Sequence, residues 1–122
     1  MKKIILIVDD SESIRNLVRF TLEGADFDVL SAENGQEALK FFDDERKMHL
    51  LLTDLHMPIM NGMELIKHVR QNSVYSHMPI LFLTTETQVG IKKEAKELGA
   101  TGWIVKPFNS DKLISTVKKV LR

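Results

Sequence analysis

Short apolar runs alternate along the chain with longer segments in which apolar residues recur at helical spacing. The runs are too short to form buried helices, so they indicate β-strands. The segments between and after the runs carry apolar residues three and four positions apart, which predicts a helix after each strand. The five predicted strands lie at residues 4–8, 27–31, 50–53, 80–83 and 103–105.

Each predicted helix has its own apolar stripe. The last has the clearest start, because either Asn109 or Ser110 could cap it. The stripes, in chain order, consist of Ile14, Leu17, Val18, Thr21 and Leu22; Ala38, Leu39 and Phe42; Leu65, Ile66 and Val69; Ile91, Ala95 and Leu98; and Leu113, Ile114, Val117 and Leu121.

A regular alternation of strand and helix predicts a parallel sheet, because each helix returns the chain to the same end of the sheet as a right-handed crossover. The runs at 4–8 and 50–53 are almost continuously apolar rather than alternating. Strands with that composition are buried on both faces. The sequence therefore predicts a doubly wound α/β fold with helices on both sides of the sheet.

Composition limits the classes of protein to which the chain could belong. A length of 122 residues suits one domain, residues 1–122, with a core of its own. The absence of Cys excludes disulfides, a thiol nucleophile and a Cys-based zinc site. A net charge of zero argues against a dedicated nucleic-acid binder, and no apolar run approaches the ~20 residues that span a bilayer. The start of the chain lacks the features of a signal sequence, so we expect a cytoplasmic protein.

Charge is nevertheless distributed unevenly. Residues 1–87 carry 9 basic and 14 acidic side chains, a net charge of −5, whereas residues 88–122 carry 8 basic and 3 acidic side chains, a net charge of +5. The acidic part could concentrate cations, and the basic part could attract an acidic partner. Solvated helix faces would explain both equally well.

Polar residues follow four of the five predicted strands. Asp9 and Asp10 come after the first strand, Asp54 after the third, Thr84 after the fourth and Lys106 after the fifth. Ligands of open parallel sheets bind beyond the carboxyl ends of the strands. These residue types at that position therefore predict a shared site.

Three carboxylates beside one lysine favour a bound cation, because like charges at short range repel. Hard oxygen ligands without His or Cys favour Mg²⁺, which commonly binds through one or two carboxylates plus phosphate oxygens. On this reasoning Asp54 accepts a phosphoryl group, Asp9 and Asp10 hold the metal, and the Thr84 hydroxyl bonds to the phosphoryl oxygen. Taken singly, each residue has a simpler explanation; an aspartate after a strand, for example, often caps the next helix.

The motifs at these strand ends resemble those of the receiver domains of two-component response regulators, and most closely the stand-alone chemotaxis (CheY-like) type. The resemblance extends along essentially the whole chain. The matching motifs are Val8-Asp9-Asp10, Thr53-Asp54-Leu55-His56-Met57-Pro58, Met60-Asn61-Gly62, Leu83-Thr84-Thr85 and Val105-Lys106-Pro107-Phe108.

The resemblance implies a flavodoxin-like (βα)5 fold with strand order 2-1-3-4-5 and a cis bond before Pro107. It also implies that Asp54 is phosphorylated by a sensor histidine kinase. The implied Mg²⁺ ligands are Asp10, Asp54, Asp9 through water, and the backbone carbonyl of His56.

The same resemblance implies a conformational switch. Thr84 and Lys106 match the residues that bind the acyl phosphate, and Trp103 matches an aromatic that rotates inward in the active state. Chemotaxis regulators often have Tyr at the position of Trp103, and the larger indole, whose nitrogen is a donor only, is a departure. His56 and Glu86 match variable positions that tune hydrolysis of the acyl phosphate.

We therefore expect a single-domain response regulator that signals by protein contact, with a flagellar motor switch as the candidate target and a phosphatase as a further candidate partner. Its only chemistry would be self-phosphorylation and autodephosphorylation. Two alternatives remain open. One is a Mg²⁺-dependent phosphohydrolase that uses an aspartyl-phosphate, and the other is a phosphorelay intermediate or adaptor that is not tied to chemotaxis. A receiver-like binding module that is never phosphorylated is a separate hypothesis, which the presence of Asp54, Thr84 and Lys106 makes less attractive.

Overall fold

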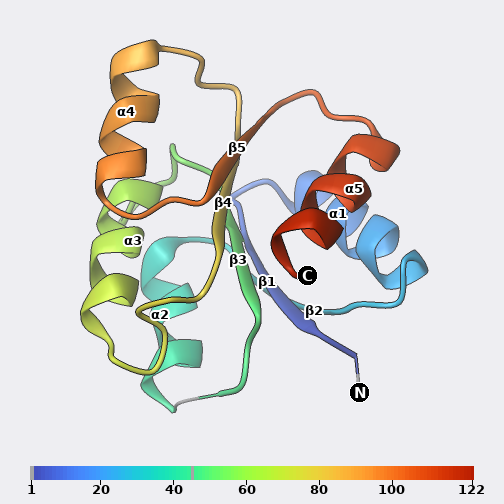
Figure 1. Ribbon diagram of the computed structural model, residues 1–122, viewed down its shortest axis with the longest axis horizontal. Coiled ribbons are helices and arrows are strands. Elements are labelled where there is room, and N and C mark those ends of the chain that lie inside the picture. Colours follow the sequence, from blue (N-terminus) through green and yellow to red (C-terminus); the bar gives the residue numbers. More distant parts are fainter. Residues whose placement is uncertain (1, 45) are drawn as a thin grey trace.

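The computed structural model describes residues 2–44 and 46–122, in which strands and helices alternate strictly (Figure 1). The strands are β1 (Ile4–Val8), β2 (Asp28–Ala32), β3 (Leu50–Thr53), β4 (Ile80–Thr84) and β5 (Gly102–Val105). The helices are α1 (Glu12–Gly24), α2 (Gly35–Asp43), α3 (Gly62–Gln71), α4 (Val89–Glu97) and α5 (Ser110–Val120).

The strands form one parallel sheet of order β2-β1-β3-β4-β5. Helices α1 and α5 cover one face, and α2, α3 and α4 cover the other (Figure 1). The expected doubly wound flavodoxin-like fold and its strand order are thus confirmed. Among the described residues, no helix has the length and apolar character needed to cross a membrane.

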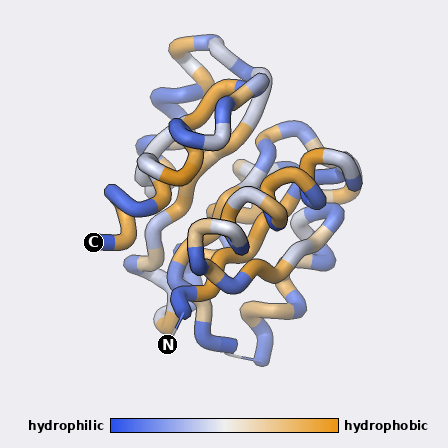
Figure 2. The backbone as a smooth tube through the Cα atoms, turned by 90° about the vertical axis from the view of Figure 1, so that its right-hand side faces the viewer, coloured by the Kyte–Doolittle hydropathy of each residue, from blue (hydrophilic) through white to orange (hydrophobic). Residues whose placement is uncertain are grey.

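The sheet separates two apolar clusters, because side chains of each strand point alternately to its two faces. Leu6, Leu51 and Phe82 pack with the helices on the α2–α3–α4 side, whereas Ile7 and Leu52 pack with α1 and α5. Strands β1, β3 and β4 are buried along almost their whole length. Figure 2 shows hydrophobic segments of the backbone, in orange, in the interior of the molecule.

Polar caps fix where the helices begin. The side chains of Ser11, Asn34, Asn61 and Asn109 accept hydrogen bonds from the first turns of α1, α2, α3 and α5. Asn61 also forms a capping box with Glu64. Of the two cap candidates for the last helix, Asn109 is the one that caps it.

Several details differ from the sequence prediction. Strand β4 extends to Thr84 and β5 begins at Gly102, each one residue beyond the predicted strand. Strand β2 begins and ends one residue later than predicted, because its pairing with β1 starts at Asp28 and extends to Ala32. Leu17 is 45% exposed and does not belong to the buried stripe of α1. Its neighbour Val18 faces the sheet, and the helix turns by about 100° per residue, which carries Leu17 to the edge of the buried face.

Candidate functional site

The carboxyl ends of β1 and β3 meet at the centre of one edge of the sheet. The Asp54 amide donates to the Val8 carbonyl at 2.9 Å, which fixes the two strand ends side by side. Asp9, Asp10 and Asp54 each offer one oxygen, and these three oxygens lie within 4.8 Å of one another. Asp9 and Asp54 are buried, while Asp10 is exposed. The three aspartates predicted from the sequence therefore gather in one cluster.

Lys106 reaches this cluster from the end of β5. Its Nζ lies 2.6 Å from Asp9 Oδ2 and 3.1 Å from Asp54 Oδ2. Its amide donates to the Thr84 carbonyl at 2.8 Å, which ties the base of the lysine to the neighbouring strand. The Lys106–Pro107 peptide bond is cis, as the resemblance implied. The four strand ends thus place one ammonium between two buried carboxylates.

The electrostatics of the cluster favour a second positive charge. Burial raises the pKa of Asp9, and the hydrogen bonds from Lys106 and Ser11 offset this only in part. Burial alone would lower the pKa of Lys106, but hydrogen bonds and charge from Asp9 and Asp54 outweigh it and raise that pKa. The raised pKa of Lys106 means that its ammonium stays charged, and the raised pKa of Asp9 means that this ammonium does not fully compensate the buried carboxylates. Three carboxylates and one ammonium carry a formal charge of −2, which a divalent cation would neutralise.

The donor set fits Mg²⁺. The ligand atoms are hard carboxylate oxygens, and Asp10 lies on the exposed side, where ordered water can complete a coordination shell. The His56 imidazole is directed elsewhere, since its Nε2 lies 3.0 Å from Glu86 Oε1. A ligand from His56 would therefore have to be its backbone carbonyl.

Backbone amides also hold the carboxylates, and these contacts were not predicted from the sequence. The Ser11 amide donates to Asp9 Oδ1 at 2.9 Å, and the Leu55 amide donates to Asp54 Oδ1 at 2.7 Å. Arg15 from α1 donates to the Asp9 carbonyl at 2.7 Å. Any residue but proline supplies an amide, so no side-chain pattern could have revealed the first two contacts.

Thr84 and Trp103 occupy the adjoining part of the site. The Thr84 side chain is buried, and its Oγ1 accepts a hydrogen bond from the Glu86 amide at 3.3 Å. The Trp103 indole donates to the Glu86 carbonyl at 3.0 Å and lies 5.2 Å from the Phe82 ring, centroid to centroid. One short segment after β4 therefore contacts both the hydroxyl and the aromatic that the sequence analysis singled out.

The His56–Glu86 pair joins two loops at the mouth of the site. Both residues stand out in the sequence, but their contact could not be predicted there, because they lie 30 positions apart. The hydrogen bond from His56 lowers the pKa of Glu86. The pair connects the loop after Asp54 to the loop after Thr84.

A doubly wound flavodoxin-like sheet with an acidic cluster and a lysine at its carboxyl edge defines a class of α/β proteins whose carboxylates are arranged so that they could hold a metal ion. Comparison with known proteins narrows this class. Residues 5–118 match the response regulator receiver domain, and the chain belongs to that family.

Individual relatives agree with this assignment. The chain is 38% identical over 118 residues to the chemotaxis protein CheY1 of Helicobacter pylori, covering 96% of this chain and 95% of that protein. The solved structure of the chemotaxis protein CheY4 of Vibrio cholerae is 45% identical, has a TM-score of 0.94, and is matched over 99% of this chain and 100% of that one. The chain is also 39% identical to the transcriptional regulatory protein PhoP of Bacillus subtilis, but there it spans only half of the longer protein. The expected CheY-like receiver is thus confirmed.

Proposed function

We propose that the protein is a single-domain response regulator. It would change between two states when Asp54 accepts a phosphoryl group from a phosphohistidine. Receiver domains interact with histidine kinases and with downstream targets, which makes a sensor kinase the expected donor. The observation that carries the proposal is the position of Asp54. Its side chain is 11% exposed, and its Oδ2 lies 3.1 Å from the Lys106 ammonium and beside two further aspartates.

The transfer itself needs few groups. A carboxylate oxygen of Asp54 attacks the phosphorus atom, the bond from phosphorus to the donor nitrogen breaks, and the nitrogen keeps the electron pair. Asp9, Asp10, Asp54 and the His56 carbonyl would hold Mg²⁺. When bound, this ion would offset charge on the transferring oxygens. The Lys106 ammonium and the Thr84 hydroxyl would bond to the phosphoryl group after its arrival.

The signal would pass through the loop after β4. The Thr84 hydroxyl now accepts a hydrogen bond from the Glu86 amide, so turning it toward a phosphoryl group would release that amide. The Glu86 carbonyl holds the Trp103 indole, and Lys92 lies 5.7 Å above the indole ring. A change at Thr84 would thereby reach the surface formed by α4, β5 and α5.

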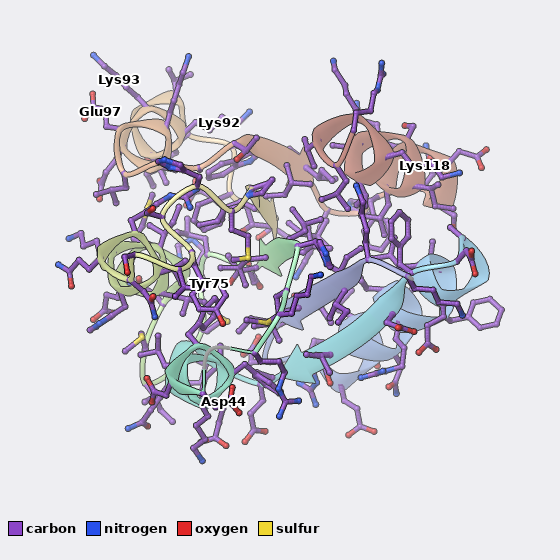
Figure 3. All side chains as sticks on the ribbon, turned by 60° about the horizontal axis from the view of Figure 1, so that its bottom comes forward. Asp44, Tyr75, Lys92, Lys93, Glu97 and Lys118 are labelled. Atoms are coloured by element: carbon purple, nitrogen blue, oxygen red, sulfur yellow. The ribbon has the colours of Figure 1, made fainter. Side chains whose placement is uncertain are left out.

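That output surface is basic. Figure 3 shows Lys92 and Lys93 on α4 and Lys118 on α5. An acidic peptide or helix of a target protein would suit it. Because the relatives include chemotaxis proteins, we propose a flagellar motor switch component as the target and the cytoplasm as the location. The basic residues of the surface are Lys92, Lys93, Lys96, Lys112, Lys118 and Lys119.

Incubation with Mg²⁺ and acetyl phosphate tests the proposal. We expect the intact mass to increase by one phosphoryl group, and the fluorescence of Trp103, which is the one tryptophan of the sequence, to change when Mg²⁺ is present. Chelation of the metal should prevent both changes. Repeated release of phosphate from diverse organic phosphates would instead favour a phosphohydrolase. Binding of Mg²⁺ without any gain in mass would favour a module that is never phosphorylated.

Asp10→Ala tests the metal ligands separately. Removing a carboxylate ligand should weaken Mg²⁺ binding by about tenfold or more, as measured by titration of Trp103 fluorescence or by calorimetry. Asp28→Ala is the matched control, because Asp28 is exposed at the start of β2, at the opposite edge of the sheet. Equal Mg²⁺ affinity in wild type and Asp10→Ala would mean that the ligands have been misassigned.

A further inference from the structure

Ile59, in the loop between β3 and α3, has a backbone conformation that its side chain disfavours. Its φ is 72°, in the left-handed region, where a β-branched residue is strained. The Met60 amide donates to the Pro58 carbonyl at 2.8 Å, which closes a tight γ-turn around Ile59. Asp26 has a similar φ of 74°, but aspartate tolerates this region better than isoleucine does. Backbone preference therefore does not account for isoleucine at position 59.

Burial does not account for it either. Ile59 is 72% exposed, so its side chain gains little from the core. The nearby side chains of Met57 and Met60 behave differently, since both pack against the apolar cluster on the α2–α3–α4 side. The loop thus turns two apolar side chains inward and holds a third outward in a strained turn. An outward apolar side chain kept at this cost indicates contact with another molecule.

The loop holds Ile59 firmly in this position. The Gly62 amide donates to the Leu55 carbonyl at 2.9 Å, which closes the loop on itself. The Gly35 amide donates to the Met60 carbonyl at 3.2 Å, which fastens the loop to the start of α2. A loop whose backbone is already fixed loses little conformational freedom when a partner binds.

We propose that Ile59 is an apolar docking contact for the phosphohistidine-bearing protein that phosphorylates Asp54. This inference rests on the proposed function. Ile59 follows Asp54 by five residues, on the loop that also carries His56. The phosphorus atom of the donor must reach the Asp54 carboxylate, so the surface of the donor must cover the sheet edge from which this loop extends. A target bound to the basic surface of α4, β5 and α5 has no such requirement.

Three variants test the proposal. Ile59→Asn removes the apolar side chain but tolerates positive φ, Ile59→Val keeps an apolar β-branched side chain, and Val74→Asn is the matched control. Val74 is 54% exposed in the loop between α3 and β4, at the opposite edge of the sheet. The protein donor is the autophosphorylated domain of a histidine kinase selected for rapid transfer to the wild-type chain, and acetyl phosphate is the small-molecule donor.

Ile59→Asn should lower kcat/KM for transfer from the kinase domain by about tenfold or more, the factor expected for one lost apolar contact. Its rate with acetyl phosphate should stay within about twofold of wild type, and its melting temperature should be equal or higher, because the strain is relieved. Ile59→Val and Val74→Asn should transfer normally.

Kinase transfer to Ile59→Asn at the wild-type rate would overturn the inference. An equal loss with both donors would also overturn it, because the side chain would then act on the site itself rather than on docking. If Ile59→Asn were phosphorylated normally but bound the target protein more weakly, Ile59 would contact the target instead. If it self-associated more weakly, Ile59 would contact a second copy of the chain. The proposed function fails by a different result, namely a wild-type chain that gains no phosphoryl group even from acetyl phosphate.

Discussion

Asp54→Asn should gain no phosphoryl group from acetyl phosphate in the presence of Mg²⁺, whereas the wild-type chain gains one. The neutral amide has no carboxylate oxygen to attack phosphorus, so an acyl phosphate cannot form. Asparagine has nearly the same shape and can still accept the Leu55 amide through its Oδ1, so the fold should persist. Intact mass spectrometry measures the adduct, and thermal denaturation verifies folding.

The matched control for this variant is Asp28→Asn, the same chemical change at an exposed position at the opposite edge of the sheet. It should be phosphorylated like wild type. An adduct that persists in Asp54→Asn would contradict the role of Asp54, and peptide mapping would then show whether Asp9 or Asp10 accepts the group. Trp103 fluorescence should likewise stop responding to acetyl phosphate in Asp54→Asn, because the signal originates at residue 54.

Strands and helices could be predicted because burial leaves a regular trace in the sequence. Strands β1 and β3 are continuous apolar runs, since helices cover both of their faces, and their predicted bounds agree with the structure. Leu17 shows where the apolar pattern is not sufficient. Apolar spacing alone does not tell which of two adjacent apolar residues faces the sheet. The apolar pattern does not specify strand order either, and only the family resemblance predicted it.

The gathering of Asp9, Asp54 and Lys106 could be predicted for a related reason: each follows a strand, and parallel strands end at one edge. The supporting contacts could not. The His56–Glu86 pair joins residues of two separate loops, and its formation depends on how those loops fold. The strained turn at Ile59 runs against the preference of its own side chain, so local propensity would have excluded it.

The start of α3 approaches the phosphoacceptor segment closely enough that position 62 has to be glycine. A Cβ on Gly62 would overlap the Asp54 carbonyl oxygen, and it would lie 2.6 Å from Cε1 of Phe82 and 3.1 Å from the Leu55 Cα. Two of these neighbours are backbone atoms, so relief would have to come from moving the end of β3 or the helix itself. The helix is held there by its capping box and by the hydrogen bond from the Gly62 amide to the Leu55 carbonyl.

Gly62→Ala should therefore lower the free energy of unfolding by about 2 kcal/mol, the cost of overpacking a close contact, as measured by urea denaturation. Phosphorylation by acetyl phosphate should also slow, because the displaced backbone carries Asp54. Gly24→Ala is the matched control. Apart from its chain neighbours and the adjacent backbone of α1, no atom of the described residues lies within 4 Å of the Cβ that this variant would add, so stability should stay unchanged or rise by about 0.5–1 kcal/mol. If Gly62→Ala and Gly24→Ala were equally stable, α3 would have to lie farther from β3 than the structure places it. The close packing of α3 against the Asp54 backbone would then not support the proposed role of Asp54.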